Sequence, residues 1–170
     1  MIRRATRQDW PEIVRLSVEA FGASAWPWKR WRDLLSAAPQ PVAEPVQALA
    51  LVAAPAEPPP PLAGYVALQM IHGEVEIQAL AVAKGVRRQG WGTRLLNAAC
   101  EHARQAGCHT ALLEVRLGNL PAQAFYGHLG FLVCGRRPRY YHSPLEDALL
   151  MRKSLVAAAS PCTEAGADAT

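Results

Sequence analysis

The residues with the clearest chemical meaning lie in one loop near the middle of the chain: Arg87, Arg88, Gln89, Gly90, Trp91, Gly92 and Thr93. The loop follows a strand-like segment, Val75 to Ala83, and opens a helix-like one, Thr93 to Ala106. Its two glycines allow close backbone approach, and amide groups at the start of a helix attract an anion. This pattern predicts a phosphate site, although an ordinary basic turn that contains glycine has a similar composition.

The charges around this loop agree with a phosphate ligand and narrow its type. No acid stands between residues 84 and 94, where four cations are found: Lys84, Arg87, Arg88 and Arg94. A dinucleotide fingerprint needs a third glycine where Leu95 stands, and a P-loop ends in Gly-Lys-Ser or Gly-Lys-Thr. We therefore expect a ligand that is neither NAD nor ATP.

The composition is that of one globular domain. The 170 residues are 51% hydrophobic and 19% charged, enough for a core that folds unaided. We expect a single domain over residues 1–155 and a disordered tail over 156–170, which lacks apolar periodicity. No segment approaches the roughly 20 apolar residues of a membrane span, and no apolar block follows the charged first residues, so we expect no signal peptide. We therefore expect a cytoplasmic monomer or weak oligomer with no membrane partner.

Cysteine spacing and charge distribution exclude two further classes. The cysteines lack the close pairs of a zinc site, so we expect no metal and mostly buried, reduced thiols: Cys100, Cys108, Cys134 and Cys162. The net charge of +4 and the pI near 9.1 are compatible with a nucleic-acid partner. The basic residues form several short clusters without an RNA-binding signature, so we expect no direct contact with nucleic acid.

Hydrophobic periodicity predicts a mixed α/β architecture. The expected strands are Ile2–Thr6, Val46–Ala54, Leu62–Ile71, Glu74–Ala83, Thr110–Leu117, Phe131–Arg136 and Ala148–Lys153. Four helices are expected. The first begins at an Asp9 N-cap, the second contains Trp31, Leu34 and Leu35, and the last two span Thr93–Ala106 and Asn119–Leu129. The strands between residues 46 and 83 should form an antiparallel meander, and the last two strands should pair. Prolines between residues 39 and 61 predict stiff, exposed loops.

This order of elements, together with several motifs, resembles the GCN5-related N-acetyltransferases. Their signature, Gln/Arg-x-x-Gly-x-Gly/Ala at the head of the central helix, is matched by Arg87, Gly90 and Gly92. Within the family the chain is most similar to RimI-like enzymes, through Trp26-Pro27-Trp28, Leu113-Glu114-Val115-Arg116, Ala124-Phe125-Tyr126, Leu129-Gly130-Phe131, Arg139-Tyr140-Tyr141 and Glu146-Asp147-Ala148. The resemblance implies an α/β fold with a mixed sheet, an antiparallel N-terminal meander and central strands that splay apart.

The resemblance implies acetyl-CoA as a co-substrate. The family pattern places the pyrophosphate on the amides of Arg88 to Thr93 and the pantetheine arm along the backbone of Leu80, Ala81 and Val82, as an added strand. The same three residues also suit a core strand, because only their main chain would bind. Asn119 matches a residue that hydrogen-bonds to coenzyme A, while its type alone predicts an N-cap. The serine that commonly precedes it in the family is Gly118 here.

Two catalytic residues are implied by the same resemblance. Glu114 matches the proton acceptor of the family, and Tyr126 matches a tyrosine whose hydroxyl lies near the coenzyme sulfur. Their spacing alone places Glu114 on the polar face of its strand and Tyr126 among apolar helix residues. Because no cysteine occupies a catalytic position of the family, we expect direct transfer in a ternary complex.

The acceptor is the least specified part of the prediction. The resemblance implies Trp28, Tyr140 and Tyr141 as substrate-binding residues and a protein N-terminal amine as acceptor, in the family the alanine of a ribosomal protein. Residues Arg136 to Arg139 either steer an acidic acceptor or form a solvated turn. Two alternatives stay open: the same machinery acting on a small amine or a lysine, and a non-catalytic module that binds acetyl-CoA.

Overall fold

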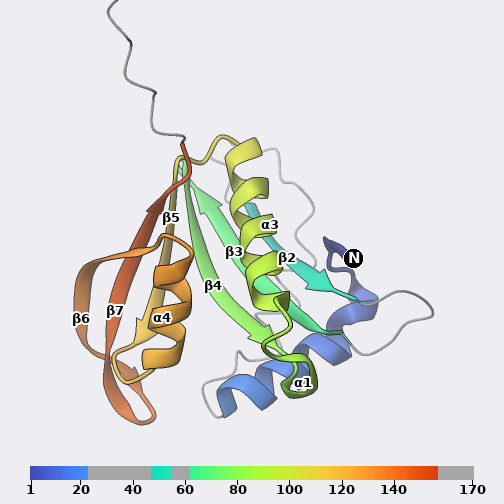
Figure 1. Cartoon of the computed structure of the whole chain (residues 1–170), viewed down its shortest axis with the longest axis horizontal. Helices are drawn as coiled ribbons and strands as arrows, with labels where there is room; N and C mark the ends of the chain where they lie inside the picture. The colour runs from blue at the N-terminus through green and yellow to red at the C-terminus, as the bar shows by residue number, and fades with distance from the viewer. Residues whose placement is uncertain (23–46, 55–61, 157–170) are drawn as a thin grey trace, which may run out of the picture.

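A seven-stranded mixed sheet forms the centre of the molecule (Figure 1), and the computed structural model describes residues 1–22, 47–54 and 62–156. The strands lie in the order β1-β2-β3-β4-β5-β7-β6. Their bounds are β1 Ile2–Arg4, β2 Gln47–Ala53, β3 Gly64–Ile71, β4 Glu74–Val82, β5 Thr110–Arg116, β6 Leu132–His142 and β7 Leu145–Ser154. The predicted mixed sheet is confirmed.

The meander predicted for residues 46–83 is present as β2, β3 and β4, each antiparallel to the next. Its second turn is tight because His72 and Gly73 both have positive φ angles, 50° and 79°, as a two-residue hairpin of type I′ requires. The alternation of the strands gives the sheet two apolar faces, and a separate cluster of buried side chains lies on each.

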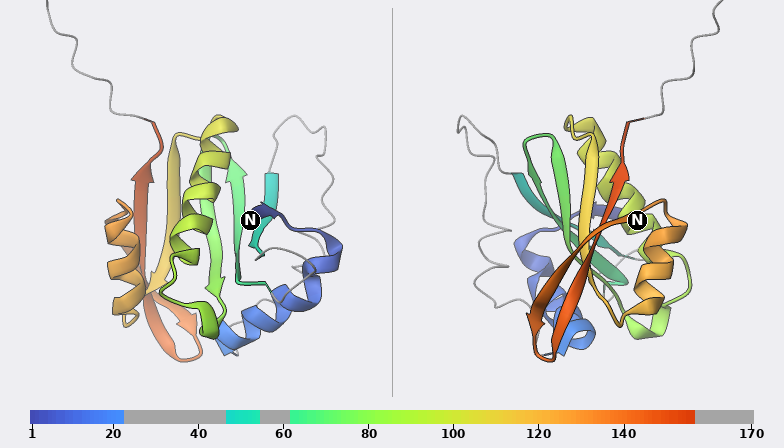
Figure 2. Two further views of the ribbon diagram at one scale, coloured as in Figure 1. Left: turned by 45° about the vertical axis from the view of Figure 1, so that its right-hand side comes forward. Right: turned by 90° about the vertical axis from the view of Figure 1, so that its left-hand side faces the viewer.

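Helices cover both faces of the sheet (Figure 2). Helix α1, Trp10–Phe21, packs Ile13 and Leu16 against one face. Helix α3, Trp91–Gln105, buries its apolar side on the other face, and α4, Leu120–His128, packs against that same cluster. The 3.6-residue spacing predicted for the central helix is therefore the spacing that buries its core residues: Leu95, Leu96, Ala99, Cys100 and Ala103.

The two central strands, β4 and β5, run parallel and pair only over their first halves. The register joins Glu74–Ile77 to Thr110–Leu113 and is not continued in the remainder of these two described strands. The β3–β4 register skips Gln78, which marks a bulge where the strands begin to diverge. Residues Leu80–Val82 therefore pair with β3 alone, and the predicted splay is confirmed.

The N-terminal prediction needs two corrections. The first strand ends at Arg4 rather than at Thr6, and Asp9 does not cap α1 with its side chain. The Asp9 carboxylate instead accepts a hydrogen bond from the Thr6 amide at 2.8 Å and pairs with Arg3 at 2.6 Å. A charged guanidinium is a stronger partner for the buried Asp9 carboxylate than a helix amide, so Arg3 takes it.

The C-terminal prediction also needs corrections. Strand β6 extends to His142 instead of ending at Arg136, so Arg136–Arg139 belong to a strand and do not form a solvated turn. Cys134 is exposed rather than buried. Cys134 is exposed because β6 lies at the edge of the sheet, and β6 is longer than predicted because Tyr141 and His142 pair again with β7 beyond the bulge.

Several predictions fall outside the described residues. These are Trp26-Pro27-Trp28, the helix around Trp31, most of the proline-rich loops and the tail after Val156. Within the described ranges, no helix combines the length and apolar character that crossing a membrane requires.

Candidate active site

The loop that precedes α3 lies at the end of β4 where the central strands diverge (Figure 1). A 3-10 turn, Lys84–Val86, leads into it, and α3 begins at Trp91. Arg88 and Gly90 both adopt positive φ angles, 60° and 80°. Glycine tolerates this conformation at low cost, whereas the Cβ atom of Arg88 makes it unfavourable there. The first amides of α3 have no carbonyl partner within the helix, so they are available to an anion.

Two contacts fix this loop relative to its neighbours. The Arg87 guanidinium donates from Nε to the carbonyl of Val82 at 3.1 Å, which ties the loop to the end of β4. A Cβ atom on Gly92 would lie 3.3 Å from Cζ of Phe125, so the second glycine is what lets α3 and α4 meet closely. The Arg94 guanidinium lies over the Trp91 ring, 4.9 Å from its centre. The start of α3 is therefore held by both β4 and α4.

A cavity of about 310 Å³ opens between the diverging strands. Its walls include six of the residues predicted for the site: Leu80, Glu114, Asn119, Tyr126, Tyr140 and Tyr141. Ala81, Val82 and the loop before α3 do not line the cavity. They follow Leu80 along the chain, at the end of β4 and beyond it. Trp28 lies outside the described residues. Elements β4, β5, α4 and β6, together with Ser17 and Phe21 of α1, thus contribute to one space.

Glu114 faces this cavity from β5 on the polar side that the alternation predicts. Its neighbours Leu113 and Val115 are buried on the other face, while the Glu114 side chain keeps 15% of its surface exposed. Its carboxylate pairs with Nη1 of Arg137 at 2.8 Å, and hydrogen bonding to Glu114 is the main cause that raises the pKa of Tyr140 to about 12. The sequence indicated Arg137 only as part of the basic run Arg136–Arg139, and its contact with Glu114 was not predicted.

Tyr126 faces the same cavity from α4 and is packed among aromatic rings. Its ring lies edge-on to Phe125 and Phe131, with centroids 5.3 and 6.0 Å away. Burial raises the pKa of Tyr126 to about 12, and the nearby Tyr141 adds to the shift. The phenol is therefore protonated throughout the neutral range and is a donor of hydrogen bonds.

The turn between β5 and α4 is held by Glu146 of β7. This carboxylate accepts from the Gly118 amide at 2.6 Å and pairs with Arg116 at 3.0 Å. A Cβ atom at Gly118 would lie 2.9 Å from the same Glu146 oxygen, so the glycine found in place of serine permits this approach. Asn119 acts as the N-cap, because its side chain accepts from the Ala122 amide at 3.2 Å. Its side chain also lines the cavity.

A bulge in β6 places the other wall of the cavity. The β6–β7 register shifts between Arg137 and Tyr141, and Arg139 in the bulge has a φ of 53°. Asp147 of β7 holds the bulge by accepting from the Arg139 amide at 2.8 Å and from Arg136 Nε at 2.6 Å. The Glu-Asp pair of the sequence motif thus fixes the two segments that flank Glu114, one through each acid.

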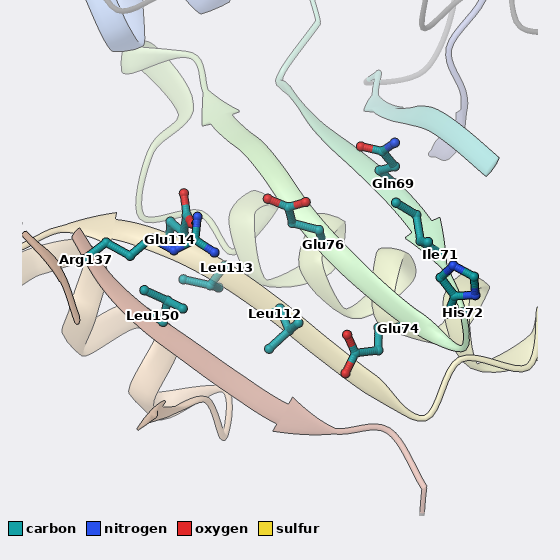
Figure 3. Close-up of a pocket in the computed structure, with 10 residues that line it drawn as sticks. All are labelled: Gln69, Ile71, His72, Glu74, Glu76, Leu112, Leu113, Glu114, Arg137 and Leu150. Atoms are coloured by element: carbon teal, nitrogen blue, oxygen red, sulfur yellow. The ribbon is translucent and has the colours of Figure 1, made fainter. Parts of the chain in front are cut away.

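A second pocket of about 370 Å³ adjoins the first along the same face of the sheet (Figure 3). Glu76 and Glu114 line both pockets, and Arg137 lines the second. Its floor is apolar, with Leu112 and Leu150, and its rim carries Glu74. Among the described residues, no group of His, Cys, Asp and Glu side chains has the arrangement of a metal site.

The chain matches the model of the Acetyltransferase (GNAT) family over residues 10–131, and it belongs to that family. It is 34% identical over 86 residues to the ribosomal protein bS18-alanine N-acetyltransferase of Haemophilus ducreyi. That match covers 49% of this chain and 59% of the relative, so the chain spans little more than half of that protein's length.

Two solved structures show the same fold over nearly the whole chain. The ribosomal-protein-S18-alanine N-acetyltransferase from Escherichia coli superposes with a TM-score of 0.73 at 24% identity, covering 95% of this chain and 97% of the other. Arabidopsis thaliana NAA60 in complex with acetyl-CoA gives a TM-score of 0.76 at 14% identity, with coverage of 91% and 97%. The predicted GNAT fold is therefore confirmed.

Proposed function

We propose that this protein transfers the acetyl group of acetyl-CoA to the free α-amine of a protein N-terminus. The observation that carries the proposal is the meeting of a carboxylate, Glu114, and a partly buried phenol, Tyr126, in one cavity where the central strands diverge. In its sharpest form the acceptor is the N-terminal alanine of a ribosomal protein, which the name of the Haemophilus ducreyi relative supports.

The co-substrate fits the β4 side of the cavity by its chemistry. Pyrophosphate carries negative charge and suits the amides of Gly90 to Thr93 at the start of α3, together with the nearby arginine side chains. The pantetheine arm contains two amides, which suit the main chain of Leu80–Val82 because β5 does not pair with that segment. When bound, acetyl-CoA supplies the activated acetyl group.

Glu114 is the proposed general base. Acetyl transfer needs the acceptor amine without its proton, and a terminal α-amine titrates near 7.7 to 8.0 where a lysine titrates near 10.4. A carboxylate that lines the cavity can receive this proton, directly or through water. The lower basicity of an α-amine favours a protein N-terminus, since less help from the base is needed.

Tyr126 is the proposed donor to the leaving sulfur. With its pKa raised to about 12, the Tyr126 phenol stays protonated at neutral pH and is a weaker acid than an ordinary thiol, whose pKa lies near 8.5. The phenol therefore stabilises the departing thiolate by donating a hydrogen bond and keeps its own proton.

Direct attack by the acceptor is favoured over an acetyl-cysteine route. Burial raises the pKa of Cys100 and of Cys108, which keeps both as unreactive thiols, and Cys134 lies exposed on β6. The residues that line the cavity include none of these three cysteines. The base and the phenol then act on one complex of enzyme, acetyl-CoA and acceptor.

The test is acetyl transfer to a panel of acceptors with the full chain. The panel contains peptides with a free N-terminal alanine, the same peptides blocked at the N-terminus but carrying one lysine, and small amines. We expect the free N-termini to react with the highest kcat/KM. Preference for the blocked lysine peptides or for small amines would overturn the acceptor class. Binding of coenzyme A by calorimetry with no transfer to any acceptor would favour a non-catalytic module.

A further inference from the structure

We propose that Arg137 determines specificity, by donating a hydrogen bond to the first peptide carbonyl of the acceptor while Glu114 accepts from its amine. The inference rests on the proposed function and deepens it, because it states why this site would prefer an α-amine to a lysine. Arg137 and Glu114 form a donor and an acceptor side by side, with Nη1 and Oε1 2.8 Å apart.

The spacing of this pair matches the start of a peptide. Standard backbone bond lengths separate the amine nitrogen of a terminal residue from its own carbonyl oxygen by about 3 Å. An extended lysine side chain holds its ε-amine more than about 6 Å from the nearest carbonyl of its residue, because four methylene groups intervene. An acceptor that presents an amine and a carbonyl to Glu114 and Arg137 together is therefore an α-amino amide.

The guanidinium has hydrogen-bonding capacity beyond its ion pair. Arginine carries five N–H donors, and the contact with Glu114 is made through Nη1. The side chain keeps 55% of its surface exposed and lines the second pocket, so its remaining donors are within reach of a ligand there. Figure 3 shows Arg137 reaching Glu114 from the neighbouring edge of the sheet.

The fold fixes Arg137 in this position. Pro138 and Arg139 occupy the β6 bulge directly after it, and Asp147 holds that bulge through the Arg139 amide and the Arg136 side chain. A bulge turns the side chains beside it away from the regular alternation of a strand. Arg137 also lies over the Tyr140 ring, 5.6 Å from its centre, which limits the directions that its side chain takes.

The charges of the second pocket suit the same acceptor. Glu74 and Glu76 line it without an ion-pair partner in the described part of the chain, so the pocket attracts a cationic amine. Placing an arginine among these carboxylates weakens that attraction. Its presence there is explained by a requirement for a hydrogen-bond donor, which a carbonyl oxygen would satisfy.

The test compares two peptides that differ in one atom. One peptide begins with alanine and has a free N-terminus. In the other, sulfur replaces the carbonyl oxygen of that alanine to give a thioamide, and sulfur is the weaker hydrogen-bond acceptor. We expect the wild-type protein to favour the oxygen peptide about tenfold in kcat/KM, the ratio that one hydrogen bond from a charged donor provides.

Arg137→Met should bring this ratio close to one, because methionine has similar length and no donor, and Arg137→Lys should restore part of it. Arg139→Asn is the matched control: it removes a neighbouring positive charge, keeps the amide that Asp147 holds and suits a positive φ. The control should keep the wild-type ratio. Thermal unfolding of each variant verifies that it is folded.

Two results would overturn the inference, and they are distinguishable. An Arg137→Met protein that still acetylates peptides with the wild-type oxygen-to-sulfur ratio contradicts the role of Arg137 and leaves the proposed function standing. A wild-type protein that binds coenzyme A and acetylates lysine peptides but no free N-terminus contradicts both the role of Arg137 and the proposed function, since no first peptide carbonyl is then recognised.

Discussion

The two walls of the cavity are built by different means. On the β4 side the functional groups are mainly main-chain groups, held by the bulge at Gln78 and by two glycines at the start of α3. On the β6 side they are side chains, and the acids Glu146 and Asp147 of β7 hold the segments that carry them. A wall of main-chain groups depends on backbone conformation, whereas a wall of side chains depends on charge.

This difference matches the chemistry proposed for each wall. Every coenzyme A molecule presents the same pyrophosphate and amides, so a fixed row of backbone groups serves a constant ligand. Acceptors differ from one another in charge and shape, and Arg137 and Tyr140 are exposed on an edge strand, where substitution costs the fold little. Glu114 lies on β5, between the two walls, and is the proposed general base.

The largest effect is expected where the walls meet, at Glu114. Glu114→Gln should lower kcat by about 10²- to 10⁴-fold, because the amide keeps the shape of the side chain and loses its function as a base. The Kd for coenzyme A, measured by calorimetry, should change less than about twofold, since the β4 wall is untouched. Glu101→Gln on α3 is the control: it too removes the carboxylate of an ion pair, but at an exposed site outside the cavity, and it should retain full activity. Unchanged turnover of Glu114→Gln across the pH range would exclude Glu114 as the base.

The β4 wall could be predicted from the sequence because its signals are local. Two glycines with a spacing of two residues, basic neighbours and a following apolar period indicate a helix that starts at an anion site, and α3 does start there. The alternation in β5 likewise predicted the face of Glu114. The positive φ of Arg88 was not predicted, because sequence patterns assign that conformation to glycine.

The β6 wall could not be predicted in the same way. The run from Arg136 to Arg139 contains a proline and indicates a turn, yet the edge strand accommodates Pro138 in a bulge where no ladder hydrogen bond is lost. The contact of Arg137 with Glu114 joins strands that β7 separates in the sheet, so no short spacing reports it. One signal was present: two acids and three arginines on successive strands favour cross-strand pairing.

A smaller effect is expected at the β4 wall from Gly92→Ala. The added Cβ would lie 3.3 Å from Phe125, so α3 and α4 must separate slightly and the amides at the start of α3 must move. Overpacking of this size costs about 1 kcal/mol, which predicts a Kd for coenzyme A weakened by about five- to tenfold. Gly85→Ala is the matched control in the preceding turn, because a Cβ there meets no atom within 4 Å. Equal affinity of the two variants, measured by calorimetry, would show that packing at Gly92 does not position the anion site.

The smallest effect is expected from protonating Glu146 and Asp147, the two acids of β7. It lowers the stability of the fold only at acidic pH and is absent at neutral pH. Hydrogen bonding from the Gly118 amide, helped by Arg116, lowers the pKa of Glu146 from its ordinary value of 4.5. The Arg139 amide, helped by Arg136, lowers the pKa of Asp147 from 3.8. Since the folded protein holds these protons less tightly than the unfolded chain, stability rises with pH across this window. The contribution is complete above the ordinary values and is lost as pH falls through the lowered ones.

Amide proton shifts in an NMR pH titration report these contacts one by one. The Gly118 amide should shift with a midpoint below 4.5 and the Arg139 amide with a midpoint below 3.8, each following the acid it binds. The Ala122 amide is the internal control, because it donates to Asn119, which does not titrate. An Arg139 midpoint at or above 3.8 would mean that Asp147 does not hold the β6 bulge in solution, and Arg137 would then lose the support that places it beside Glu114. A Gly118 midpoint at or above 4.5 would mean that Glu146 does not hold the turn between β5 and α4.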